Sequence, residues 1–153
     1  MLATPVLTAP LPEIRDELET NLFGIIRVAR AFAPVLAEHP VSSMVNVLSV
    51  LSWLALRGGY EISKSAAWSA TNSLRVALRE QGTMVTALHV AYMDTEMVGG
   101  FDAPKADPAG IAAQSADAII AGDFEILADD TTRAVKAQLS ENLTALYSQL
   151  APA

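Results

Sequence analysis

The chain has 153 residues, of which 52% are apolar, and a net charge of −7, a composition typical of one folded globular domain spanning 1–153. The acidic balance argues against nucleic acid as a partner, because neutralising phosphates requires clustered Lys and Arg. The sequence has no cysteine, which excludes disulfides and a thiol nucleophile, and its two histidines, His39 and His89, lie too far apart in sequence to form a metal-ligand pair.

The first ten residues, Met1 to Pro10, predict an irregular lead-in without the basic region and apolar core of a signal peptide. A helix is expected from about Pro12 to near His39–Pro40, with Pro34 kinking it or marking a turn. Its apolar residues recur at helical spacing: Ile14, Leu18, Leu22, Ile25, Ile26, Ala29 and Phe32. The longest apolar runs are shorter than the roughly 20 residues of a membrane span. We therefore expect no membrane partner and a cytoplasmic location.

Two buried strands and a long helix are predicted in the middle of the chain. The valine-rich run Ser43 to Val50 favours a strand with Ser49 at its C-terminal end. A loop with Gly58 and Gly59 leads to a helix from about Tyr60 to Gln81, which Gly82 is placed to cap. The second strand follows over Thr83 to Val90.

The remaining sequence predicts a helix, a short strand and a last helix. Asp107 and Pro108 are a strong start signal for a helix that ends at Gly122. A strand over Phe124 to Ala128 and an amphipathic helix over Thr131 to Leu150 complete the order. Such alternation predicts an α/β fold with a parallel sheet of about three strands and about four flanking helices.

Candidate catalytic side chains fall where the C-terminal strand ends meet, which is where open α/β sheets bind ligands. Ser49 and the segment 91–95 both lie there. Tyr60 and Lys64 are four residues apart, so they share one helix face, and an ammonium beside a phenol is expected to lower the phenol's pKa. The serine could then hold a carbonyl oxygen while the tyrosine donates a proton. The alternative is a partly exposed tyrosine with a solvated lysine one turn further on.

The stretch V-N-V-L-S-V-L-S-W-L-A-L-R-G-G-Y-E-I-S-K-S-A-A-W, residues 45–68, resembles the active-site region of the short-chain dehydrogenase/reductase family. It contains that family's strand ending in the catalytic serine, followed by its Y-x-x-x-K helix. The segment E-T-N-L-F-G, 19–24, resembles the family's segment carrying the fourth catalytic residue, at Asn21. The segment H-V-A-Y-M-D-T, 89–95, resembles its P-G-x-x-x-T segment and ends at Thr95.

The resemblance implies a site of Ser49, Tyr60, Lys64 and Asn21 in a Rossmann-like fold. Tyr60 would be the acid/base, Lys64 would lower its pKa and bind the cofactor ribose, and Ser49 would polarise a substrate carbonyl. Asn21 would hold a relay water, and Thr95 would contact the nicotinamide end. The implied reaction is hydride transfer between NAD or NADP and a small-molecule carbonyl or alcohol.

The sequence departs from the family pattern at three points. It has neither the T-G-x-x-x-G-x-G phosphate loop nor the N-A-G segment, so we expect it to begin after the family's fourth strand. Ser49 and Tyr60 lie closer together than the family usually has them. Ser52 is an alternative that fits the spacing worse and the strand end not at all. Ala91 and Tyr92 replace the usual Pro-Gly, which puts bulk where a nicotinamide would lie.

Two other functions remain open from the sequence. One is a cofactor-independent ester hydrolase with Ser49 as nucleophile, activated through Tyr60 and Lys64. The other is a non-catalytic assembly fragment. In the family the helices that correspond to 12–38 and 60–81 pack against partner subunits, and the strand 43–50 would have an open edge. We therefore expect a homo-oligomer.

Overall fold

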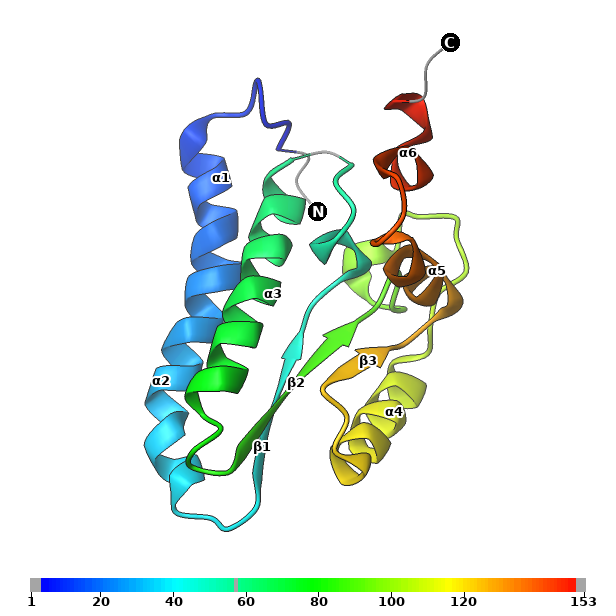
Figure 1. The fold of residues 1–153 in the computed structure, drawn as a ribbon. Helices are drawn as coiled ribbons and strands as arrows, with labels where there is room; N and C mark the ends of the chain where they lie inside the picture. The colour runs from blue at the N-terminus through cyan, green and yellow to red at the C-terminus, as the bar shows by residue number, and fades with distance from the viewer. Residues whose placement is uncertain (1–3, 57, 151–153) are drawn as a thin grey trace.

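Three parallel strands form a sheet with helices on both faces in the computed structural model, which describes residues 4–56 and 58–150 (Figure 1). The strands are β1 (Ser42–Val47), β2 (Thr83–His89) and β3 (Glu125–Leu127), in the order β1-β2-β3. This confirms the predicted α/β architecture. β2 is the central strand, and β1 and β3 lie at the two edges of the described sheet.

The first helix runs along one face of the sheet beside α3 (Figure 1). It consists of α1 (Leu11–Leu18), a π-helical turn (Glu19–Phe23) and α2 (Gly24–Ala37). Pro34 lies inside α2, and the helix continues beyond it for three residues. Because a proline so near the helix end removes only one hydrogen bond of the last turns, the main irregularity is instead the π turn.

The continuous helix Leu11–Ala37 is 27 residues long and, by length and composition alone, apolar enough to cross a membrane. The short uninterrupted apolar runs did not predict this. The core helix of a soluble protein and a signal sequence near the N-terminus pass the same test; here only 6% of the apolar window is buried, and α1 contacts α3.

β1 ends at Val47, earlier than predicted, so Ser49 lies two residues beyond the strand. The pairing with β2 nevertheless continues, since the Leu48 amide donates to the Leu88 carbonyl (2.7 Å) and the Val50 amide to the Val90 carbonyl (3.0 Å). The backbone of the segment 48–50 is thereby fixed although it is not a regular strand. This is the segment that carries the candidate serine.

Helix α3 (Gly59–Ala77) is shorter at its C-terminus than predicted. Leu78 ends it, and Gly82 is not its cap. Gly82 instead has φ +79° in the turn into β2, where its amide donates to the Arg79 carbonyl (3.0 Å). A left-handed residue is what this turn requires, and glycine adopts that conformation without steric cost.

Helix α4 (Pro108–Ala121) has the predicted ends and covers the opposite face of the sheet (Figure 1). The Asp107 carboxylate accepts from two amides of the first turn, and Gly122 ends the helix in a left-handed conformation. The core is accordingly split by the sheet. Leu88 packs on the α4 side with Ile111 and Ile126, and its neighbour Ala87 packs on the α3 side.

The predicted last helix over 131–150 is broken into three pieces. They are α5 (Asp130–Gln138), α6 (Leu143–Leu146) and a 3-10 turn (Ser148–Leu150). The Asn142 side chain accepts from the Thr144 amide (3.2 Å) and starts a new helix there. Because asparagine competes for backbone amides in this way, the single-helix prediction was wrong.

Candidate functional site

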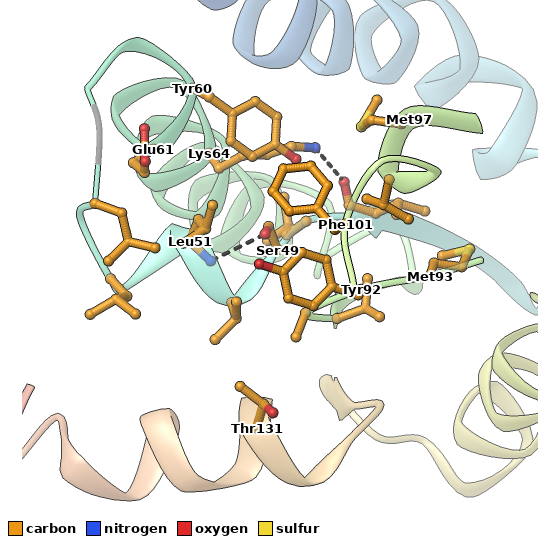
Figure 2. Close-up of a pocket in the computed structure, with 18 of the residues that line it drawn as sticks. Ser49, Leu51, Tyr60, Glu61, Lys64, Tyr92, Met93, Met97, Phe101 and Thr131 are labelled. Atoms are coloured by element: carbon orange, nitrogen blue, oxygen red, sulfur yellow. Dashed lines mark hydrogen bonds between the residues drawn. The ribbon is translucent and has the colours of Figure 1, made fainter. Parts of the chain in front are cut away.

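A cavity of about 390 Å³ lies at the C-terminal ends of β1 and β2 (Figure 2). Ser49, Tyr60, Lys64 and Thr95 all line it, although they come from four separate segments. Asn21 lines a second hollow of about 320 Å³, whose wall includes Tyr60 as well. The structure thus brings the five predicted residues to two adjoining cavities that share the tyrosine.

Ser49 is held in place through both its side chain and its backbone. Its Oγ accepts from the Leu51 amide (3.1 Å) at the start of a 3-10 turn, Val50–Ser52. Its carbonyl oxygen lies 3.2 Å from Nδ1 of His89. The Oγ of Ser52, the alternative serine, accepts a hydrogen bond from the Ser49 amide (3.4 Å), and Ser52 is not among the cavity residues. The geometry therefore favours Ser49 as the functional serine.

Tyr60 and Lys64 lie on one face of α3, as their spacing predicts. Nζ of Lys64 is 5.6 Å from the centroid of the Tyr60 ring and donates to the Val47 carbonyl (3.1 Å). The helix starts at this point because Gly58 adopts φ +136° and its amide donates to the Glu61 carboxylate (2.9 Å). This start places the tyrosine in the first turn, at the mouth of the cavity.

The pKa of Tyr60 is raised above its ordinary value, chiefly because burial penalises the phenolate. A hydrogen bond with the Ser49 side chain lowers this pKa, while the charges of Glu17 and Glu61 raise it further. Burial also lowers the pKa of Lys64. Lys64 is not among the groups that shift the pKa of Tyr60, so the expected effect of Lys64 on this pKa stays a prediction. Burial thus favours the protonated form of the Tyr60 phenol.

Asn21 lies within the π turn and is tied to the start of α3. Its Nδ2 donates to Oγ of Ser63 (2.9 Å) and to the Glu17 carboxylate (3.2 Å). Ser63 in turn donates to the Tyr60 carbonyl (2.7 Å). The amide group is thus linked to the tyrosine through the backbone. Sequence reasoning missed Ser63 and Glu17, although a serine three residues after a helix-start tyrosine was a usable signal.

Thr95 stands at the cavity wall just before a 3-10 turn, Glu96–Val98, and its Oγ1 donates to the Met93 carbonyl (3.2 Å). Tyr92, which replaces the family's glycine, also lines the cavity, and its ring packs on Phe101 with centroids 5.6 Å apart. The bulky side chain expected at this position thus lies in the cavity wall, packed on Phe101. Figure 2 shows both rings beside Ser49.

His89 contacts the backbone of Ser49 from the central strand β2. As predicted it is a strand residue, fully buried in β2, but its contact with the Ser49 carbonyl was not anticipated. His89 thus contacts the peptide of the candidate serine without lining the cavity. No periodicity in the sequence could have identified this contact, because the two residues are 40 positions apart.

The nicotinamide end of a dinucleotide fits the residues present. Tyr60, Lys64 and Thr95 bring hydroxyl and ammonium groups to the cavity, and about 390 Å³ is within the range of small-molecule sites. The phosphates are a different matter, because the sequence has no glycine-rich phosphate loop. Among the residues that the structure describes, no group of three or more His, Asp or Glu side chains could hold a metal ion.

Comparisons with known proteins give the same family that the motifs indicate. The chain is 34% identical over 104 residues to a 1-deoxy-11-beta-hydroxypentalenate dehydrogenase from Streptomyces exfoliatus, a match that covers 66% of this chain and 38% of that protein. It is 27% identical over 97 residues to an NADPH-dependent 1-acyldihydroxyacetone phosphate reductase from Schizosaccharomyces pombe, covering 62% and 32% of the two chains. The chain therefore spans about a third of the length of these curated relatives.

A solved structure matches nearly the whole fold. It is a short-chain dehydrogenase from Burkholderia cenocepacia J2315 in complex with NADP, with a TM-score of 0.82 and 30% identity, covering 98% of this chain and 66% of that one. The family model described as short chain dehydrogenase matches residues 3–106, well over half of the sequence. The chain belongs to the short-chain dehydrogenase family.

Proposed function

We propose that the chain carries the catalytic site of an oxidoreductase that interconverts a carbonyl and an alcohol with a nicotinamide cofactor. The observation that carries this proposal is the convergence of Ser49, Tyr60 and Lys64 on one cavity. Two hydroxyl donors in one cavity are what a carbonyl oxygen requires when negative charge develops on it.

The residues divide the work as follows. The hydroxyls of Ser49 and Tyr60 bind the carbonyl oxygen, and the phenol gives it a proton as it becomes an alcohol oxygen. The raised pKa of Tyr60 keeps this proton in place at neutral pH. Lys64 anchors the cofactor side, where the bound nicotinamide supplies or accepts the hydride. Asn21 and Ser63 hold the first turn of α3 and so orient the phenol.

We propose NADP as the cofactor in preference to NAD. The support is the Burkholderia cenocepacia relative, which is 30% identical and was solved with NADP. Titrating NADPH and NADH against the chain and following nicotinamide fluorescence tests the preference directly. Equal affinity for both, or tighter binding of NADH, would contradict it.

The activity test follows NADPH absorbance in the presence of an uncharged ketone. Tyr60→Phe should lower the rate by about 10²- to 10⁴-fold, the usual worth of a general acid. Tyr147→Phe is the matched control, because Tyr147 is outside the cavity and its hydroxyl accepts from the Ala55 amide (2.9 Å). Equal rates for the two variants would show that the Tyr60 phenol is not the acid.

Nothing in the site favours the hydrolase over the oxidoreductase. A serine nucleophile needs a base, whereas the pKa of Tyr60 is raised and the His89 ring contacts the serine carbonyl rather than its hydroxyl. Turnover of p-nitrophenyl acetate that disappears in Ser49→Ala would revive the hydrolase. The absence of both cofactor binding and ester turnover would leave the assembly fragment.

We further propose that the chain self-associates through an apolar stripe on α2. Val28, Phe32 and Val35 recur at helical spacing and are 54%, 55% and 50% exposed. The stripe is one-sided and the preceding helix α1 carries Glu13, so helix packing explains it better than a membrane span does. The cytoplasmic location stays a prediction that cell fractionation would test.

Sedimentation of the purified chain at micromolar concentration tests the association. Phe32→Glu should shift the chain toward monomer, because a charge cannot be buried unpaired in an apolar contact. Ile120→Glu, on the 85% exposed Ile120 of α4, should leave the oligomer unchanged. A wild-type monomer would refute the proposal, and flotation with liposomes would point to a membrane instead.

A further inference from the structure

The wall of the 390 Å³ cavity beyond the catalytic hydroxyls is almost entirely aliphatic or aromatic. One side is formed by the segment after β1, with Leu51, Leu54 and Leu56. Another side is formed by Met93 and Val98, from the segment after β2. Figure 2 shows Met93 on the other side of Ser49 from Leu51. An apolar wall of this extent favours an apolar ligand, because polar groups would lose water without gaining partners.

Part of the cavity wall is formed by the loop 92–106, whose two ends are hydrogen-bonded to each other. Its base is closed by two backbone hydrogen bonds between segments, from the Asp94 amide to the Ala106 carbonyl (2.9 Å) and from the Ala106 amide to the Tyr92 carbonyl (2.8 Å). The paired rings of Tyr92 and Phe101 then face Ser49 (Figure 2). Since these rings and the methionine side chains make wide contacts without charge, they suit a compact hydrocarbon body.

Charged recognition is weak in this cavity. Of the described residues that line it, only Glu61 and Lys64 carry a charge. The Glu61 carboxylate accepts from the Gly58 amide, and Lys64 donates to the Val47 carbonyl. In the proposed function Lys64 is engaged with the cofactor, which leaves it less available to an anion on the substrate. A carboxylate, phosphate or sulfonate on the substrate would therefore be desolvated without a guanidinium fork to receive it.

We propose that the substrate of this site is an uncharged, predominantly aliphatic carbonyl compound or alcohol, whose body contacts the leucines of 51–56 and the Tyr92–Phe101 rings while its oxygen meets Ser49 and Tyr60. The proposal rests on the proposed oxidoreductase function, since that function identifies the catalytic end. It adds the exclusion of anionic substrates, which the catalytic residues alone do not determine.

A matched pair of ketones tests the proposal by ligand-observed NMR. Camphor is a compact bicyclic ketone, and camphorsulfonate is the same skeleton with one negative charge. Camphor should bind at least about tenfold more tightly than camphorsulfonate, measured with and without NADP⁺. Leu54→Asn should weaken camphor binding by about tenfold, because it places an amide in the apolar wall. Leu7→Asn is the control, since Leu7 is 94% exposed and outside the cavity.

Each result decides the proposal separately from the oxidoreductase assignment. Equal binding of the two ketones, no binding of camphor in either condition, or no effect of Leu54→Asn overturns the substrate class. Camphor binding without any NADPH-dependent turnover of ketones supports the pocket and counts against the oxidoreductase. Turnover of a keto acid without camphor binding overturns the substrate class and keeps the oxidoreductase.

Discussion

The imidazole of His89 stacks on the indole of Trp53, with ring centroids 3.9 Å apart and the planes inclined by 21°. Its Nδ1 lies 3.2 Å from the Ser49 carbonyl oxygen, and its Nε2 has no hydrogen-bond partner among the described residues. Burial lowers the pKa of His89 to about 4, and the charges of Lys136 and Arg75 lower it further. The Ser49 carbonyl and the charge of Glu125 act in the opposite direction and raise this pKa. The folded chain therefore holds this histidine neutral.

Acid should destabilise the fold through His89. The unfolded chain takes up the histidine proton near pH 6.5, whereas the folded chain does so only near pH 4. The unfolded state thus binds more protons between these values, so this contribution is complete above pH 6.5 and is lost as the pH falls to about 4. The full effect corresponds to about 3 kcal/mol. Urea unfolding followed by tryptophan fluorescence at several pH values measures it.

The control for this pH effect is the other histidine. His89→Gln should flatten the acid limb of the stability curve, because glutamine does not titrate, whereas His39→Gln should leave the limb as it is since His39 is exposed. An acid limb of unchanged size in His89→Gln would mean that carboxylates, not His89, cause the loss.

Glu17 should tune the proton donor. Its charge raises the pKa of Tyr60, so Glu17→Gln should lower that pKa and make the phenolate available at lower pH. Alcohol oxidation, which needs the phenolate, should therefore rise at lower pH than in the wild type, and the pH profile of the oxidation rate measures this. Glu13→Gln is the matched control, because Glu13 lines the same hollow but is not among the charges that shift Tyr60. A shift toward higher pH, or the same shift in both variants, would refute this role.

The buried pair Asn46 and Thr71 should be worth more than an exposed hydrogen bond. The Thr71 hydroxyl accepts from the Asn46 amide (3.0 Å) and donates to the Ala67 carbonyl (2.8 Å) in the interior. Thr71→Val keeps the shape but leaves the Asn46 amide unpaired, which should lower the free energy of unfolding by about 1–3 kcal/mol. Ser73→Ala removes a similar but exposed bond to Ser69 and should change it by less than about 0.5 kcal/mol. Denaturant unfolding of both variants decides the matter, and equal small losses would contradict the argument.

The sequence predicted those features that depend on neighbours along the chain. Asp107 and Gly122 bound α4 as expected because both caps act within one turn. Tyr60 and Lys64 share a face because i and i+4 do so on any helix. Ser49 joins them because parallel strands end at one edge of a sheet, although it lies beyond β1 rather than within it.

Features that depend on distant segments were not predictable in this way. The raised pKa of Tyr60 results from burial and from charges on α1 as well as α3, which spacing alone does not reveal. The Asn21–Ser63 bond joins residues 42 positions apart. The prediction of one long last helix was wrong for a local reason instead, since the Asn142 side chain competes for a backbone amide within the helical pattern.

Gly58, just before α3, should be the glycine of the chain that tolerates substitution least. Gly58 has φ +136°, pairs with Pro5 in an isolated antiparallel bridge, and a Cβ there would collide with the Thr4 carbonyl oxygen and lie 2.7 Å from the Val6 amide. Gly58→Ala should therefore lower the free energy of unfolding by about 2 kcal/mol or more, since neither backbone can move without breaking the bridge. Gly82→Ala is the control, because Gly82 also has a positive φ, +79°, but has nothing within 4 Å of the added carbon. It should cost only the left-handed strain, about 1 kcal/mol. Urea unfolding compares the two, and equal losses would show that strain rather than the Thr4 contact sets the cost at Gly58.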